Sequence, residues 1–199
     1  MTDADNGNTE KNQVNTFKKV RAAVKIPVAI KLSPFYTNPL RFITELDKAG
    51  ASAFVLFNRL FQPDIDVGTE KHHFPYNLSN VQDHRLPLRF AGLLYGNINA
   101  SVCSNSGIFN GHDVIKMILA GADAVQVVST LYLNQIEVID SMLREIEKWM
   151  DGRGYENLEA FRGKLSGKQS NEKTPYMRAQ YIDYLMNTTE ILKKYKVIS

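Results

Sequence analysis

DVIKMILAGADAVQVVSTL, residues 113–131, contains one complete repeat of the expected fold: an apolar helix, a glycine and a buried strand. The first part places apolar residues at helical spacing, and Gly121 is the type of residue that ends a helix in a left-handed conformation. The second part, residues 124–128, is rich in valine and ends at the polar pair Ser129-Thr130. A helix that leads into a buried strand with a polar end is typical of α/β proteins with a parallel sheet.

Three more apolar runs also end in polar residues. PVAIKLSP (27–34) contains Lys31, AFVLFN (53–58) ends at Asn58, and ASVCSNSG (100–107) ends at Ser106-Gly107. We expect strands at residues 27–32, 53–57, 99–103 and 124–128, and helices at residues 11–23, 39–49, 86–95, 111–120 and 134–150. Because the carboxyl ends of parallel strands share one edge of a sheet, the polar residues are expected to line one pocket.

The repeat count predicts an α/β fold with four parallel strands, crossover helices and additional C-terminal helices. A closed barrel needs eight such units and about 250 residues. We expect residues 1–9 to be disordered, residues 10–152 to form the half-barrel, and residues 153–199 to form a helical extension with helices at 158–162 and 177–192. The strands are apolar almost throughout, which is typical of strands whose two faces are both buried in the complete fold.

Length and composition place the chain among ordinary globular proteins. It has 199 residues, 44% of them hydrophobic and 23% charged, which is enough for one sizeable core. No apolar run approaches the roughly 20 residues of a membrane span, and the polar start resembles no signal peptide. The single cysteine excludes an internal disulfide and favours the cytoplasm. A net charge of +3 gives no reason to expect a nucleic-acid partner.

The connection between residues 58 and 84 is long and lacks clear periodicity. FQPDIDVG (61–68) and KHHFPYNLS (71–79) are predicted to pair as a hairpin that turns near Gly68. A long connection at the carboxyl end of a strand often forms a lid or binding loop. Its acidic residues and its two histidines, His72 and His73, are expected to be solvated, so we predict no metal site. Cys103 lies within an apolar run and is expected to be a core thiol rather than a nucleophile.

The strand ends supply the candidate ligand-binding groups. Lys31 interrupts an apolar strand, so its charge must face a cavity, an anion or an ion pair at the barrel rim. Asn58 can bond the edge of a heterocycle or stabilise a turn. The pairs Ser106-Gly107 and Ser129-Thr130 can leave backbone N–H groups free to bind phosphate, although small residues also suit tight turns.

Six segments together resemble the dihydroorotate dehydrogenase-like proteins, which are FMN-dependent (β/α)8-barrel oxidoreductases. They are IPVAIKLSPFYTN, AGASAFVLFNR, QPDID, LPLRFAGLLYG, DVIKMILAGADAVQVVSTL and WMDGRGYENLEAFRGKLS. The resemblance covers about residues 10–190 and concerns the second half of the family barrel. It implies that the fold is the C-terminal half of a (β/α)8 barrel. It implies that FMN is the cofactor, that Lys31 contacts the flavin ring, and that Asn58 contacts flavin and substrate. It also implies that Ser106-Gly107 and Ser129-Thr130 hold the FMN phosphate.

The chain also departs from the family pattern. The resemblance places the catalytic base, a Cys or Ser, in the first half of the barrel, so no catalytic residue is assigned here. Ser106 replaces a glycine where the backbone approaches phosphate, which predicts an unfavourable φ. Arg59 follows Asn58 where orotate-binding members usually carry a small hydroxyl residue, which places dihydroorotate itself in question as the substrate.

The resemblance implies an FMN-dependent oxidoreductase that acts on CH–CH groups of a small-molecule substrate, as in pyrimidine biosynthesis. Because the half with the catalytic base is absent, we expect this chain to be inactive on its own. The alternatives are a non-catalytic module that binds a phosphorylated ligand, and a structural partner subunit. A half-barrel leaves two strand edges and an interior face uncovered. We expect them to be covered by a second copy in a homodimer, by a separately encoded first half, or by the terminal helices of a truncated product.

Overall fold

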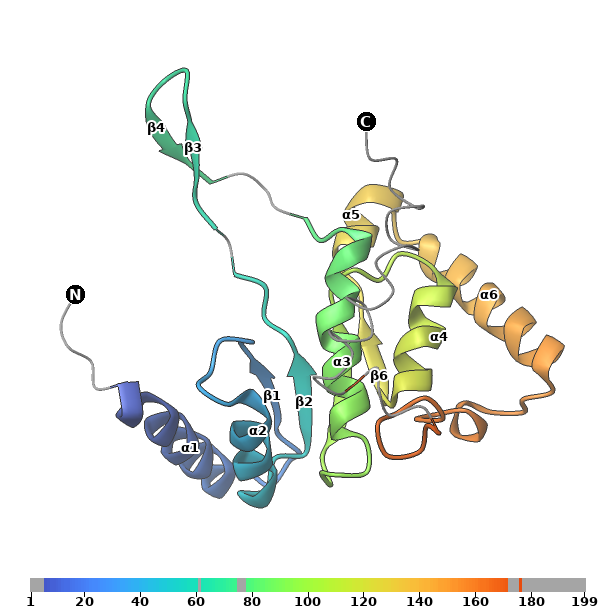
Figure 1. Cartoon of the computed structure of the whole chain (residues 1–199), viewed down its shortest axis with the longest axis horizontal. Helices are drawn as coiled ribbons and strands as arrows, with labels where there is room; N and C mark the ends of the chain where they lie inside the picture. The colour runs from blue at the N-terminus through green and yellow to red at the C-terminus, as the bar shows by residue number, and fades with distance from the viewer. Residues whose placement is uncertain (1–5, 61, 75–77, 172–175, 177–199) are drawn as a thin grey trace, which may run out of the picture.

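The computed structural model describes residues 6–60, 62–74, 78–171 and 176. It is an α/β fold around a four-stranded parallel sheet with the order β1-β2-β5-β6 (Figure 1). The elements are α1 (Asn6–Ala23), β1 (Ala29–Leu32), α2 (Pro39–Lys48), β2 (Ala53–Leu56), β3 (Asp64–Asp66), β4 (Lys71–His73), η1 (Val81–His84), α3 (Arg85–Leu94), β5 (Ser101–Asn105), α4 (Gly111–Ala120), β6 (Ala124–Gln126), α5 (Ser129–Asn134), α6 (Val138–Arg153) and η2 (Leu158–Ala160). The predicted half-barrel is confirmed: four βα units are half the number in a closed barrel.

One face of the sheet forms the core. Leu32, Phe54, Leu56 and Val102 point to this face and are at most 3% exposed. They pack in a single cluster with apolar residues of the helices α1 to α4. The strict alternation along each strand follows from the period of two residues in extended backbone.

The opposite face of the sheet is open among the described residues, as expected for the interior face of a half-barrel. Ala29, Lys31 and Ser101 are exposed on it, and Val55 and Cys103 are half-buried. The apolar strands indicated a sheet with two covered faces, but four strands provide helices for one face only. The sheet edges are open too, since β1 pairs with β2 alone and β6 with β5 alone in the described part of the chain.

Capping side chains and a glycine fix several helix ends. Asn38 caps α2 by accepting a hydrogen bond from the Arg41 N–H at 3.1 Å, and Pro39 is the first helical residue. Asn110 caps α4 in the same way through the Asp113 N–H at 2.9 Å. Gly121, with φ +123°, follows that helix.

Three predicted boundaries were wrong. Helix α1 begins at Asn6, so residues 6–9 are helical rather than disordered, because an existing helix extends at little cost. The predicted helix at 134–150 is α6, which begins at Val138 instead, and the short helix α5 before it was not predicted. Strand β5 continues to Asn105 instead of ending at residue 103. The predicted helix at 177–192 lies outside the described residues.

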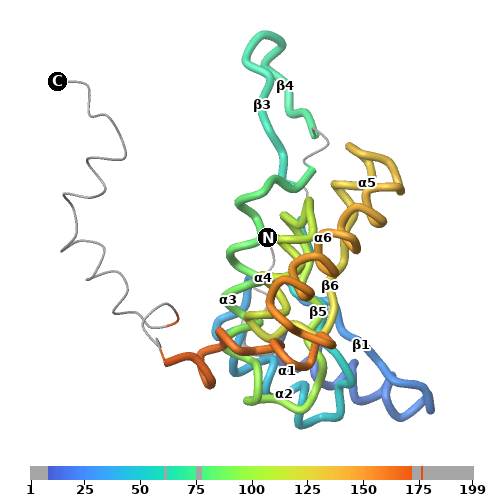
Figure 2. Tube along the Cα trace, turned by 90° about the vertical axis from the view of Figure 1, so that its right-hand side faces the viewer, coloured from blue at the N-terminus to red at the C-terminus, as the bar shows by residue number. Residues whose placement is uncertain are grey.

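The predicted hairpin is confirmed, and it projects away from the body of the protein (Figures 1 and 2). The Asp66 carboxylate accepts hydrogen bonds from the Gly68 and Thr69 N–H groups at 2.8 and 3.1 Å, which fixes the turn. No helix among the described residues is long and apolar enough to cross a lipid bilayer.

Candidate functional site

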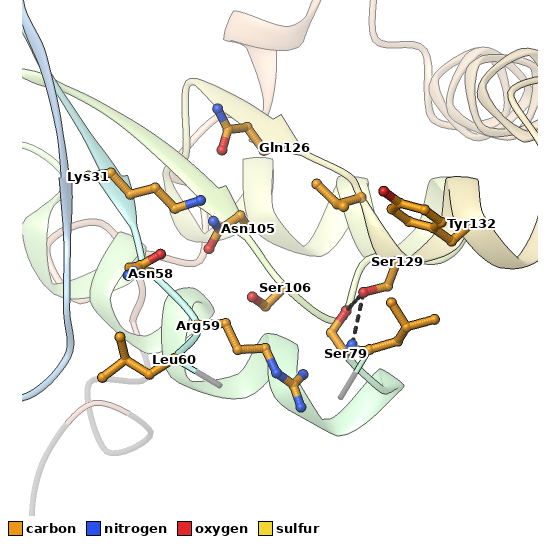
Figure 3. A pocket seen from close by; sticks show the side chains of 12 residues that line it. Lys31, Asn58, Arg59, Leu60, Ser79, Asn105, Ser106, Gln126, Ser129 and Tyr132 are labelled. Carbon is orange, nitrogen blue, oxygen red and sulfur yellow. Dashed lines mark hydrogen bonds between the residues drawn. The ribbon is translucent and has the colours of Figure 1, made fainter. Parts of the chain in front are cut away.

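A pocket of about 640 Å³ lies at the carboxyl edge of the parallel sheet (Figure 3). All four strands contribute to it, either with their last residues or with the residues just after them. Its lining consists of Lys31, Asn58, Arg59, Leu60, Leu78, Ser79, Asn105, Ser106, Gln126, Val128, Ser129 and Tyr132. Residues almost a hundred positions apart therefore line one cavity, and its volume is in the range of small-molecule sites.

Two cationic side chains reach this pocket. Lys31 lies on the open face of β1, in register with Val55 of β2, and its amine is directed into the pocket (Figure 3). Arg59 follows β2 and forms an ion pair with Asp83, which precedes α3. This ion pair joins the two ends of the long connection that carries the hairpin, so it helps to define the pocket wall.

Asn105, at the end of β5, is the most unusual polar group in the pocket. It is 7% exposed, and its Oδ1 atom has no hydrogen-bond partner among the described residues. Buried side-chain oxygens are almost always bonded, so this one indicates a partner that comes from the pocket. Ser104 Oγ is also buried and unpartnered, but Ser104 is the neighbouring strand residue and points to the other face.

The turn after β5 has the backbone conformation expected from its sequence. Ser106 has φ +71° and Gly107 has φ +68°, so the prediction of an unfavourable φ at Ser106 is confirmed. Ser106 lines the pocket, whereas Gly107 is absent from its lining. A Cβ on Gly107 would lie 2.3 Å from the His84 backbone nitrogen, so this glycine allows the turn to pack against η1.

The pair after β6 divides between the pocket and the core. Ser129 lines the pocket, and its Oγ accepts hydrogen bonds from both the backbone N–H and the hydroxyl of Ser79, each at 2.8 Å. Thr130 is fully buried, and its Oγ1 accepts a hydrogen bond from Asn134 Nδ2 at 3.1 Å. The hydroxyl of Thr130 is therefore engaged within α5 and does not line the pocket.

Cys103 lies on the open face, in register with Val55, and is half-buried. Burial raises the pKa of its thiol, the Lys31 charge opposes that rise, and Asp123 adds to it. The thiol is therefore protonated at neutral pH and is a poor nucleophile. Across the described ranges, no three His, Cys, Asp or Glu side chains are grouped so as to hold a metal ion.

Sequence reasoning missed Asn105, Gln126, Ser79 and Tyr132 as lining residues. Asn105 and Gln126 could have been found from the sequence, because each lies two residues after a strand residue on the open face and therefore points to the same face. Ser79 and Tyr132 lie outside the strands, and no pattern in the sequence distinguishes them.

The parallel sheet and its polar pocket define an α/β protein of the half-barrel type with a ligand site at the carboxyl edge of the strands. The family model for dihydroorotate dehydrogenase matches residues 2–150. The chain belongs to the dihydroorotate dehydrogenase family.

Several curated proteins are similar to this chain. Over 132 residues it is 30% identical to the catalytic subunit of dihydroorotate dehydrogenase B (NAD(+)) from Methanocaldococcus jannaschii, covering 65% of this chain and 43% of that protein. It is 26% identical over 137 residues to dihydroorotate dehydrogenase A (fumarate) from Lactobacillus helveticus, covering 66% of this chain and 45% of that protein. The catalytic subunit of dihydroorotate dehydrogenase B (NAD(+)) from Bacillus mycoides is 26% identical over 156 residues, covering 77% of this chain and 50% of that protein. The chain spans about half the length of the curated relatives it matches.

Proposed function

We propose that this chain is the flavin-binding half of a dihydroorotate dehydrogenase-like oxidoreductase and that it binds FMN in the pocket at the strand ends. The observation that carries the proposal is the convergence of Lys31, Asn58, Asn105 and Ser106 on one cavity. These residues lie on or just after three different strands, and the parallel sheet brings them together. Membership of the family supports FMN as the ligand.

The residues present fit such a cofactor. A cavity of about 640 Å³ has room for a planar heterocycle, and the unpartnered oxygen of Asn105 indicates a polar ligand. Lys31 would stabilise negative charge on the ring, and Asn58 would orient the ring or the substrate. Ser106 and Ser129 would contact the phosphate, while Gly107 and Thr130 support the two turns by their packing.

When bound, FMN supplies the acceptor for hydride removal from a CH–CH group. The same reaction needs a base for the substrate proton. None of the residues lining the described pocket is a histidine, cysteine or carboxylate, and its serines have other roles: Ser79 and Ser129 are hydrogen-bonded to each other, and Ser106 is assigned to the phosphate. We therefore expect the chain alone to bind FMN without oxidising dihydroorotate, and the base to come from another half-barrel.

Arg59 indicates the chemical class of the substrate. Arg59 lines the pocket and follows Asn58 in the chain, and its guanidinium is paired with Asp83. A bulky cation at this position favours a small molecule with an anionic group. We propose a small anionic substrate, with dihydroorotate as one member of that class.

The open face and edges of the sheet support a partner half-barrel, either a second copy of this chain or a different chain. Apolar side chains near the β6 edge are also exposed, including Val128, Tyr132, Leu133 and Ile136. Sedimentation at micromolar concentration tests the homodimer, and a purely monomeric chain would exclude it.

A non-catalytic module that binds a phosphorylated ligand is the second candidate. The lack of an evident base among the described lining residues favours it. Reduction of bound FMN by dihydroorotate in a mixture with a complementary half-barrel would exclude this candidate.

Titration of the chain with FMN, followed by flavin fluorescence, tests the proposed cofactor. Loss of a charge-assisted hydrogen bond should make Lys31→Met bind FMN about 10- to 100-fold more weakly. Lys148→Met is the matched control, because Lys148 is an exposed lysine of α6 outside the pocket lining. Absence of FMN binding to the wild-type chain, or equal affinity of the two variants, would contradict the proposal.

A further inference from the structure

The Asn105 carboxamide is held in a position that costs the empty protein stability. It is 7% exposed at the end of β5, and its oxygen has no partner in the described part of the chain. A buried polar group without a hydrogen bond destabilises a fold, whereas an apolar side chain of similar shape does not. Leucine has nearly the shape of asparagine, so stability within the described fold gives no reason for an amide at this position.

The surroundings of Asn105 show where its missing partner must come from. Asn105 lines the main pocket, and Figure 3 shows the Lys31 amine directed toward it from β1. Its cross-strand neighbour in register is Gln126 of β6, which supplies a second side-chain amide to the same pocket. Asn58 supplies a third amide, from the end of β2. Amides and one ammonium group thus face the same space.

We propose that Asn105 binds the lactam or imide edge of a planar heterocycle in this pocket. A carboxamide presents a donor and an acceptor side by side, so it pairs with a ring N–H next to a ring carbonyl in either orientation of the amide. The Lys31 ammonium then faces electron-rich atoms of the ring. The inference rests on the proposed function for the site, and the heterocycle is either the flavin ring of FMN or a pyrimidine ring.

The experiment compares wild-type protein with Asn105→Leu. We expect the ligand-free variant to unfold at the same or a higher temperature, because the unpartnered oxygen is gone. We expect its dissociation constant for the bound heterocycle to rise about tenfold or more, because a hydrogen bond to the ring is lost. The probes are FMN and uracil, each titrated separately.

Asn97→Leu is the matched control. Asn97 is exposed after α3, outside the pocket lining, and its amide already donates to the Leu93 carbonyl at 2.8 Å. It should show neither the gain in unfolding temperature nor the loss of affinity. A second measurement uses NMR on the wild-type chain, where the Asn105 side-chain NH₂ signals should shift when the ligand is added. This measurement keeps the proposal testable if Asn105→Leu does not fold.

The outcomes separate this inference from the proposed cofactor. If Asn105→Leu binds FMN as tightly as wild type and the NH₂ signals do not move, the inference is overturned while flavin binding stands. If the wild-type chain binds uracil but not FMN and the variant loses uracil, the inference stands and flavin binding fails. Binding of neither probe overturns both, and a lower unfolding temperature of a folded Asn105→Leu shows that the amide is structural.

Discussion

Gly107→Ala is the substitution for which the structure makes the sharpest prediction. The added Cβ would lie 2.3 Å from the His84 backbone nitrogen, 2.8 Å from the Asn80 carbonyl oxygen and 3.0 Å from the Asp83 carbonyl carbon. All three neighbours are main-chain atoms, so a rotamer change cannot remove the overlap. The residue also has φ +68°, which L-amino acids with a Cβ rarely adopt.

Two energetic costs determine how far Gly107→Ala should lower the free energy of unfolding. The left-handed conformation costs about 1–2 kcal/mol for a residue with a Cβ. Overpacking against a rigid neighbour adds about 1–3 kcal/mol. We therefore expect the free energy of unfolding to fall by about 2–5 kcal/mol, a large share of the roughly 5–15 kcal/mol typical of a domain.

Gly154→Ala is the control that separates the two terms. Gly154 ends α6 with φ +69°, nearly the value at Gly107, but a Cβ there would meet nothing within 4 Å. It should lose only the conformational term of about 1–2 kcal/mol. Urea unfolding followed by circular dichroism measures both variants. Equal losses would refute the argument that the turn after β5 is packed against η1.

Three further predictions concern charged and titratable groups. The hydrogen bond from the Thr69 backbone N–H lowers the pKa of Asp66, so the ionised carboxylate stabilises the turn above the ordinary carboxylate pKa. This stabilisation is lost as the pH falls through the lowered pKa. The Thr69 amide NMR signal should therefore titrate with a midpoint below about 3.9, and a higher midpoint would contradict the prediction. Lys31→Met should raise the pKa of Cys103 further and slow its labelling by a disulfide reagent at pH 8, whereas an unchanged rate would show that the lysine does not act on the thiol. Asp83→Asn weakens both the cap of η1 and the ion pair with Arg59, so it should lower the free energy of unfolding by about 1–2 kcal/mol in urea; an unchanged value would show that neither interaction contributes.

The convergence of the strand ends was predictable from sequence, because it depends only on the order of elements and on parallel pairing. Lys31 lies within one apolar run and Asn58 ends another. Both runs were predicted to be strands, and both residues line the pocket. Local capping chemistry also predicted where α2 begins, since Asn38 followed by proline is a strong start signal.

The remaining features depend on tertiary contacts that local patterns do not contain. Ser104 and Asn105 are polar and suggest a loop, yet β6 pairs with β5 as far as Asn105 and so extends the strand. Gly107 was predicted to face phosphate, but it packs against the backbone of η1 instead. Because η1 lies more than twenty residues earlier in the chain, no local pattern predicts this contact. Helix α6 begins at Val138 rather than residue 134, and no glycine or proline near Gln135 marks that start in the sequence.

The open face of the sheet has a consequence for how the ring closes. Ala29, Ala53 and Ser101 form one row across three strands, and together they provide very little volume. The interior of a closed barrel is filled layer by layer, mostly with branched aliphatic residues. Strands that close the ring must therefore bring bulky side chains opposite this row. This favours a different chain over a second copy as the partner half-barrel, because a second copy would bring the same small residues. A gene for a companion half should be recognisable by valine, isoleucine or leucine at every second position of the strands that would meet this row.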